Sequence, residues 1–140
     1  MGELLILTVI LIAVLGVLMS ILLLLKSRPV RGQALSIRNF VVLFIVYITI
    51  TIGFGALYMA MEMAGITVLT EGKRHVGGNV LHLIEDTMYF SAVTLLSVGY
   101  GDITPLGFGR PIAMFQALIG YVLPATFVVT TVIYMDKRSD

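Results

Sequence analysis

Three long apolar runs alternate with short polar stretches along the chain. The runs are Leu4–Leu25, Phe40–Ala64 and Ile112–Met135. A helix of about 20 apolar residues is long enough to cross the roughly 30 Å hydrocarbon core of a bilayer. The first run holds no charge and no proline, and Pro111 stands where the first turn of the last helix tolerates it. The pattern therefore predicts an all-α membrane protein with three transmembrane helices.

A fourth segment, Val80–Leu96, is helical in composition but too short to span a bilayer. Asn79 is a suitable N-cap, and Glu85 and Asp86 lie in the first half, where the helix dipole favours negative charge. The second half is apolar, and the polar, Gly-containing stretch 65–79 before it is typical of an extramembrane loop. We expect a re-entrant helix that enters the membrane from the loop side and stops partway.

Charge sets the orientation of these helices. Three spans place the loop after the first run and the C-terminus on one side, and the N-terminus and residues 65–110 on the other. The first side carries six basic residues and the second three: Lys26, Arg28, Arg31, Arg38, Lys137 and Arg138 against Lys73, Arg74 and Arg110. The positive-inside rule then predicts a multi-pass protein of the cell membrane, with its N-terminus outside and its C-terminus in the cytoplasm.

Composition supports a membrane protein and narrows the function. Hydrophobic residues make up 59% of the chain and charged residues 12%, with a mean hydropathy of +1.04. A soluble domain averages about 45–50% apolar and about 25% charged. A net charge of +1 gives no reason to expect a nucleic-acid partner. The sequence contains no cysteine and no recognisable nucleophile–base pair, phosphate loop or metal cluster, so we expect neither an enzyme nor a cofactor.

Two alternatives concern the start of the chain. A cleaved signal peptide would have a basic start and a shorter apolar core, whereas Glu3 leads here and the basic cluster follows the run. The polar stretch 26–38 contains four basic residues and no acid. It suits a topology-setting cytoplasmic loop, and a site for lipid headgroups is the alternative.

The segment Thr94–Asp102, which reads Thr-Leu-Leu-Ser-Val-Gly-Tyr-Gly-Asp, carries the functional signal. Non-helical backbone at membrane depth is tolerated only when it is buried in protein or lines a water-filled path. Successive carbonyls can face one axis only if alternate residues adopt left-handed angles, which Gly99 and Gly101 permit cheaply. Four such strands would stack rings of carbonyl oxygens that replace the hydration shell of a cation, and the preceding helix would aim its negative C-terminal end at the same axis.

Val-Gly-Tyr-Gly-Asp between a short helix and a final transmembrane helix resembles the signature sequence of the potassium channel family. The resemblance covers residues 39–135 in architecture and is residue-specific from Thr94 to Asp102. It implies a tetrameric ion-channel pore with an extended selectivity filter, here with an additional N-terminal helix. The implied function is passive K⁺ conduction by a homotetramer in the lipid bilayer, with K⁺ as the transported ion.

The resemblance also assigns roles by position. The selectivity filter that holds K⁺ comprises Ser97, Val98, Gly99, Tyr100 and Gly101. Asp102 flanks the outer mouth, and Tyr89, Phe90 and Thr94 support the filter from the pore helix. Three departures stand out: Ser97 replaces a Thr, Leu96 replaces a second Thr, and Val93 replaces a Glu that pairs in some members with the Asp after the filter.

These assignments divide the chain into four parts: an N-terminal transmembrane helix (1–27), a cytoplasmic basic linker (28–39), a pore domain (40–135) and a cytoplasmic tail (136–140). The pore domain is expected to contain an outer helix (40–64), a pore helix (80–96), a filter (97–101) and an inner helix (111–135). No voltage-sensing row of basic residues follows a membrane helix. A regulatory domain or subunit outside this chain is therefore possible.

Gly120 and Pro124 suggest a gating hinge in the inner helix. Pro124 lacks the N–H that would bond the Gly120 carbonyl, its ring crowds that carbonyl, and Gly120 adds backbone freedom there. A kink is expected on these grounds. The family's inner helix often bends at a Gly about this far past the filter, although the spacing here is one residue short. A static kink that only shapes the cavity is the alternative.

The remaining polar residues have simpler interpretations. His75 and His82 could sense pH, or could be ordinary exposed or pore-helix histidines. Glu62 is expected at the water interface, with a pairing to the outer loop as the alternative. Two further functions stay open: a potassium transporter subunit, which would carry unlike repeats in one chain, and a non-conducting partner that interacts through its N-terminal helix.

Overall fold

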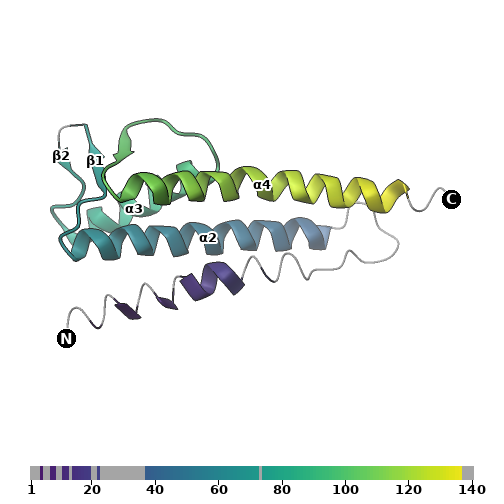
Figure 1. Ribbon diagram of the computed structural model, residues 1–140, viewed down its shortest axis with the longest axis horizontal. Coiled ribbons are helices and arrows are strands. Elements are labelled where there is room, and N and C mark those ends of the chain that lie inside the picture. The colour runs from purple at the N-terminus through teal and green to yellow at the C-terminus, as the bar shows by residue number, and fades with distance from the viewer. Residues whose placement is uncertain are drawn as a thin grey trace.

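The computed structural model describes residues 4, 7, 8, 11, 12, 14–19, 22, 37–72 and 74–136. Among these, three long helices and three short strands follow one another along the chain (Figure 1). Their bounds are α2 Ile37–Met63, β1 Leu69–Glu71, β2 Arg74–His75, α3 Val80–Leu95, β3 Ile103–Pro105 and α4 Gly109–Asp136. Helices α2 and α4 lie side by side and run in opposite directions, and α3 lies at the end of the molecule that carries the strands.

Helices α2 and α4 are long and apolar enough to cross a membrane, over Phe40–Met63 and Gly109–Val129. Helix α2 begins at Ile37, ahead of the expected start at Phe40, because Arg38 and Asn39 extend it past the apolar run. Helix α4 likewise begins at Gly109, and Pro111 lies in its first turn, where its missing N–H would have no intrahelical partner.

The expected first span lies mostly outside the described residues, as do the greater part of the basic linker and the tail after Asp136. The residues of the first run that the structure describes are helical, including the turn at 14–19. Val17 in this turn packs against the hydrophobic core.

Helix α3 is the expected pore helix and ends at Leu95, with Leu96 as its C-cap. Asn79 is its N-cap, as predicted: its backbone is extended, and its Oδ1 accepts a hydrogen bond from the Leu81 N–H at 3.4 Å. Glu85 and Asp86 lie in the first half of the helix, as predicted, but its first turn contains no acidic residue. The helix dipole acts mainly within that first turn, so it gains little from either carboxylate.

An all-α description of the chain needs correction, because the described residues include an antiparallel sheet of order β2-β1-β3. Strand β1 lies in the segment read as a loop, and it pairs with β3 beyond the filter, so that Glu71 lies opposite Ile103. Val68, Leu69 and Ile103 are buried here. Strands this short depend on pairing between distant segments, which a local pattern does not reveal.

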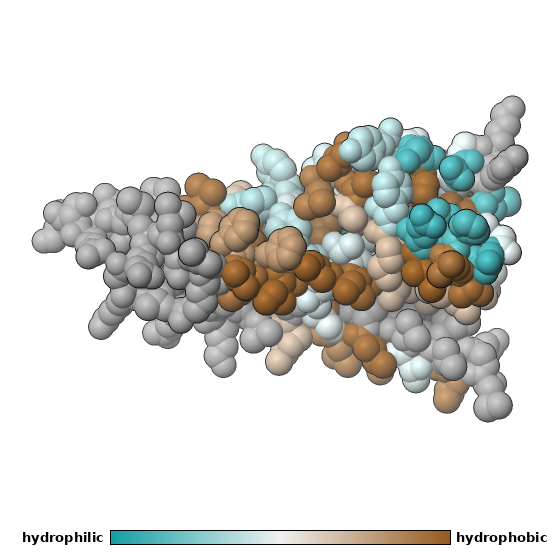
Figure 2. Space-filling model, turned by 180° about the vertical axis from the view of Figure 1, so that it is seen from behind, coloured by the Kyte–Doolittle hydropathy of each residue, from teal (hydrophilic) through white to brown (hydrophobic). Residues whose placement is uncertain are grey.

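Glu62 pairs with the segment that follows α2, which is the alternative given above to a simple water-interface position. Its Oε1 accepts hydrogen bonds from the backbone N–H groups of Val68 at 2.7 Å and Leu69 at 2.8 Å. The carboxylate therefore joins the end of α2 to the start of β1 and satisfies two donors near the sheet. Figure 2 shows hydrophilic side chains gathered at this end of the molecule and hydrophobic ones over the helices.

Candidate functional site

The candidate filter, Ser97–Gly101, directly follows the C-terminal end of α3, and its residues are exposed. Its first N–H groups turn back toward that helix. The Ser97 N–H donates to the Thr94 carbonyl at 3.1 Å, and those of Val98 and Gly99 donate to the Val93 carbonyl at 2.9 and 3.3 Å. Within the described part of the chain, the carbonyls of Ser97–Gly101 accept no hydrogen bond. The segment thus keeps its oxygen atoms free.

Backbone conformation alternates along this segment. The φ angles of Ser97, Gly99 and Gly101 are +56°, +56° and +80°, whereas Val98 and Tyr100 keep negative φ. The alternation expected at the two glycines is confirmed. The positive φ of Ser97 was not foreseen, and such a value is uncommon for a residue with a side chain. A Thr would be more strained here because it is β-branched, so Ser suits this backbone.

The carboxylate of Asp102, at the end of the segment, is held on both oxygens. Its Oδ2 accepts a hydrogen bond from the Tyr89 hydroxyl at 2.6 Å, and its Oδ1 accepts one from the Ile103 N–H at 2.9 Å. These bonds favour the charged form, so they lower the pKa of Asp102. The same Tyr89–Asp102 bond raises the pKa of Tyr89 to about 12.

The bond also bears on a departure from the family pattern. Val93 cannot supply a pairing group for Asp102, and Tyr89 on the same helix takes that position instead. No local pattern in the sequence indicates this contact, because the two residues are 13 positions apart.

The other two support residues, Phe90 and Thr94, lie one turn apart on α3. Phe90 is buried and faces α2, where its ring meets that of Tyr58 edge-on at a centroid distance of 5.1 Å. Thr94 is half-buried, and its carbonyl accepts the Ser97 N–H. Helix α3 is therefore fixed through Phe90 on the side of α2 and through Tyr89 at Asp102.

A buried polar network that the sequence analysis did not foresee joins α2, α3 and α4. The Tyr58 hydroxyl of α2 donates to Gln116 Oε1 of α4 at 3.0 Å. Gln116 Nε2 donates to the carbonyl and Oγ of Ser91 in α3, at 2.9 and 2.7 Å, and Ser91 Oγ donates to the Thr51 carbonyl of α2 at 2.8 Å. An amide inside an apolar run was the available signal, since buried polar groups in membranes need partners.

Gly120 lies where α4 passes the end of α3, and Pro124 follows about one turn later in the same helix. Helix α4 continues through Pro124 to Asp136. The Gly120 carbonyl, expected to lack a partner, accepts a hydrogen bond from the Tyr47 hydroxyl of α2 at 2.9 Å. A Cβ at Gly120 would overlap the Leu95 carbonyl oxygen. Glycine is therefore required at this position for close packing against the pore helix, in addition to any freedom that it gives the backbone.

Several titratable residues lie near one another on α3 and β1. His82 Nδ1 lies 3.7 Å from Glu85 Oε2, and both side chains are exposed. Burial raises the pKa of Asp86, and the nearby Glu71 and Glu85 carboxylates raise it further. Among the described residues, no three His, Cys, Asp or Glu side chains come together as a metal site.

Comparisons with known proteins identify a family and several relatives. Residues 76–137 match the protein family described as ion channel. The protein LctB of Bacillus caldotenax is 45% identical over 112 residues, which cover 78% of this chain and 84% of that protein. LctB of Geobacillus stearothermophilus is 47% identical over 92 residues, or 66% of this chain and 69% of that protein.

A more distant relative is named as a potassium channel. Two-pore potassium channel 5 of Arabidopsis thaliana is 29% identical over 112 residues, which cover 70% of this chain but 24% of that protein. No solved structure matches the chain. Taken with the free carbonyls and the alternating backbone of Ser97–Gly101, these similarities show that the chain belongs to the potassium channel pore family.

Proposed function

We propose that the chain is a subunit of a potassium-selective channel that conducts K⁺ passively through a filter made by four identical chains. The single observation that supports this most is the alternating backbone of Ser97–Gly101, whose carbonyls have no hydrogen-bond donors. Free carbonyl oxygens on a strand of alternating handedness can replace the water around a dehydrated cation. In this proposal, the carbonyls of Val98, Gly99 and Tyr100 form the central sites, and Ser97 contributes its carbonyl and hydroxyl to the innermost one.

The homotetramer is proposed because one chain cannot surround an ion. Each chain supplies a single filter strand, and four strands are needed for a ring. In one chain, Tyr100 is 72% exposed and Val98 is 48% exposed, and both belong to the candidate filter. We infer that neighbouring copies cover these side chains.

The membrane arrangement follows from the helices and the charges. In the proposal, α2 and α4 cross the bilayer, residues 1–27 form a third span, and α3 enters from the outside. The hydrophilic strand end would lie outside the cell (Figure 2), with the C-terminus in the cytoplasm. Asp102 would flank the outer mouth, and the C-terminal end of α3 would direct its partial negative charge toward the ions.

The proposed gate lies in α4 at Gly120 and Pro124, with the helix ends of four chains converging at the cytoplasmic side. A regulatory domain or subunit outside this chain would supply the stimulus. The structure adds one support for a mechanical link: Gly120 packs directly against the Leu95 carbonyl, two residues before the filter. Movement of α4 at this point would therefore displace the Leu95 carbonyl, and with it the start of the filter.

Flux through the purified chain in liposomes tests the function. We expect K⁺ to be strongly preferred over Na⁺ under bi-ionic conditions, and Ba²⁺ to block, because it is similar in size to K⁺ but divalent. Gly99→Ala is a suitable control, since a Cβ at a φ of +56° disturbs the filter backbone and should abolish the preference. Equal Na⁺ and K⁺ currents would refute selectivity, whereas no current would favour the non-conducting partner. Fewer than four chains in each pore would point to a transporter subunit.

A further inference from the structure

We propose that the Tyr47 hydroxyl is a positioning group for the inner helix, because it supplies to the Gly120 carbonyl the hydrogen bond that Pro124 withholds. In a regular helix the N–H of residue 124 would bond the carbonyl of residue 120. Proline has no N–H, so this carbonyl needs a donor from elsewhere. Tyr47 Oη lies 2.9 Å from the Gly120 oxygen and comes from α2, 73 positions earlier in the chain.

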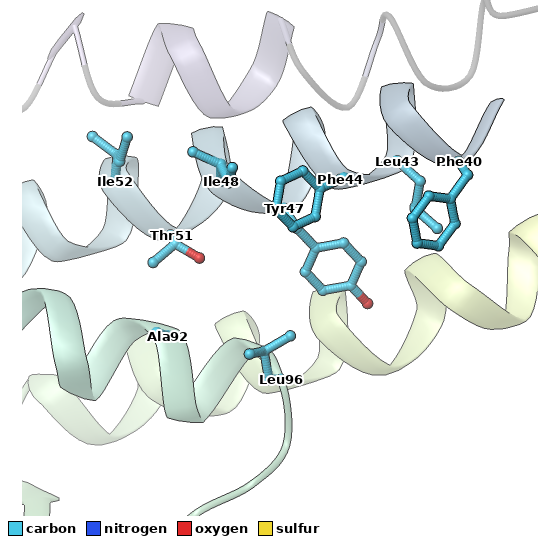
Figure 3. A pocket seen from close by; sticks show the side chains of 9 residues that line it. All are labelled: Phe40, Leu43, Phe44, Tyr47, Ile48, Thr51, Ile52, Ala92 and Leu96. Carbon is cyan, nitrogen blue, oxygen red and sulfur yellow. The ribbon is translucent and has the colours of Figure 1, made fainter. Parts of the chain in front are cut away.

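The surroundings of Gly120 leave few other donors. Gly120 is buried, and its α-carbon packs so closely on the Leu95 carbonyl that a Cβ would overlap it. The Tyr47 side chain borders an apolar cavity of about 410 Å³ between α2 and the end of α3. Figure 3 shows the Tyr47 ring extending from α2 toward α4, with Leu96 of the α3 end among the other residues that line the pocket. A site with so little polar lining offers a water molecule few partners of its own.

Three elements meet at this bond. Tyr47 belongs to the outer helix, Gly120 to the inner helix, and Leu95 is the last residue of the pore helix before the filter. A change of angle in α4 at Pro124 moves the Gly120 carbonyl, and the tyrosine must follow it or release it. Tyr47 therefore acts through Gly120: it fixes the inner helix to the outer helix at the level of the filter base.

Selective isotope labelling can resolve the signal of the Gly120 carbonyl, because few glycines in the sequence precede a tyrosine. The dipeptide Gly-Tyr occurs at residues 99–100 and 120–121 and nowhere else in the chain. Labelling glycine carbonyls with ¹³C and tyrosine nitrogens with ¹⁵N therefore gives two correlated signals in solid-state NMR of the full-length protein in lipid. The Gly120 signal reports the proposed bond, and the Gly99 signal reports whether the filter is intact.

We expect Tyr47→Phe to move the Gly120 carbonyl signal upfield, as loss of a hydrogen bond does, with the Gly99 signal unchanged. Tyr58→Phe is the matched control. It removes another buried hydroxyl from α2, but one that donates to Gln116, so it should leave the Gly120 signal in place. In a Pro124→Ala background, the alanine N–H supplies the bond, and Tyr47→Phe should shift the signal little. An unmoved Gly120 signal in Tyr47→Phe would overturn the proposal.

A functional readout rests on the proposed function and can fail separately from the NMR test. One hydrogen bond corresponds to a change of about 2- to 12-fold in an equilibrium. Tyr47→Phe should therefore change the ratio of open to closed times by an amount in this range, without changing the K⁺ to Na⁺ permeability ratio. In the Pro124→Ala background the change should fall below about twofold, because the two residues are coupled.

Equal effects in both backgrounds would contradict the proposal. If Tyr47→Phe alone fails to assemble, the double variant should assemble, and failure of both would also contradict it.

Discussion

At the scale of single residues, two side chains compensate for groups that the sequence lacks. Tyr89 holds Asp102 where Val93 cannot, and Tyr47 donates to a carbonyl that Pro124 cannot serve. Both are tyrosines, whose rings fit an apolar environment while the hydroxyl reaches a polar partner. Each hydroxyl can be removed alone by replacement with phenylalanine, so each contact can be tested without altering the shape of the side chain much.

The Tyr89–Asp102 contact predicts a measurable pKa change. The Tyr89 hydrogen bond is the main cause of the lowered pKa of Asp102, so Tyr89→Phe should raise that pKa toward the ordinary value of 3.8. Because the folded-state pKa is lowered, the bond contributes stability above pH 3.8 that is lost as the pH falls through the lowered value. Titration of the Asp102 carboxyl carbon by NMR measures the shift. Tyr121→Phe, at an exposed position on α4, should leave the Asp102 titration unchanged, and an unchanged value in Tyr89→Phe would exclude this role.

At the scale of elements, the pore helix α3 is tied to both long helices by the polar network around Gln116. The two ends of this network lie on α2, at Tyr58 and Thr51, and its middle lies on α3 and α4. In the described residues no buried side-chain nitrogen or oxygen lacks a partner. A fully satisfied network specifies how the helices pack, because any slip of one helix leaves a buried group without its partner.

The network predicts coupled effects on stability. Gln116→Leu removes the acceptor of the Tyr58 hydroxyl and leaves that buried group unpaired, which costs about 1–3 kcal/mol. Adding Tyr58→Phe removes the unpaired group, so the double variant should be less destabilised than the sum of the two single variants. Thermal unfolding in detergent measures these changes. Strictly additive losses would show that Tyr58 and Gln116 do not act together.

Features that depend on neighbouring residues could be predicted from the sequence, whereas contacts between distant segments could not. The left-handed angles at Gly99 and Gly101 depend on the residues themselves, and the N-cap at Asn79 depends on its nearest neighbours, so both were predictable. The β1–β3 pairing and the bond from Tyr47 to Gly120 join segments far apart in the chain. Neither leaves a periodic pattern, because a single hydroxyl or a three-residue strand is too short to produce one.

At the scale of the whole molecule, a single chain leaves its functional surface uncovered. The filter carbonyls face no donor, Tyr100 is exposed, and α4 presents large apolar side chains such as Met114, Phe115 and Leu118. In water such an apolar surface would favour aggregation, but in a membrane protein lipid or other copies of the chain can cover it. The proposed tetramer would cover the filter side chains by neighbouring chains and leave the outer face of α2 toward lipid and the N-terminal helix.

The N-terminal helix is therefore predicted to be peripheral. In the described part of residues 1–27, Val17 packs on the core, whereas Leu7, Leu11 and Leu18 are 64%, 59% and 52% exposed. Figure 1 places the helical turn 14–19 beside α2, on the side away from α4. A helix that lined the ion path would need a polar stripe, and Leu4–Leu25 has none.

Deletion of residues 1–27 should then leave a tetramer with an unchanged K⁺ to Na⁺ permeability ratio, measured by mass determination in detergent and by liposome flux. Deletion removes the packing of this helix on the core, so the unfolding temperature should fall while the K⁺ to Na⁺ selectivity is unchanged. A Val17→Ala variant of the full chain should lower that temperature by less. Loss of selectivity on deletion, with the tetramer still assembled, would place the helix in the conduction path and refute its peripheral position.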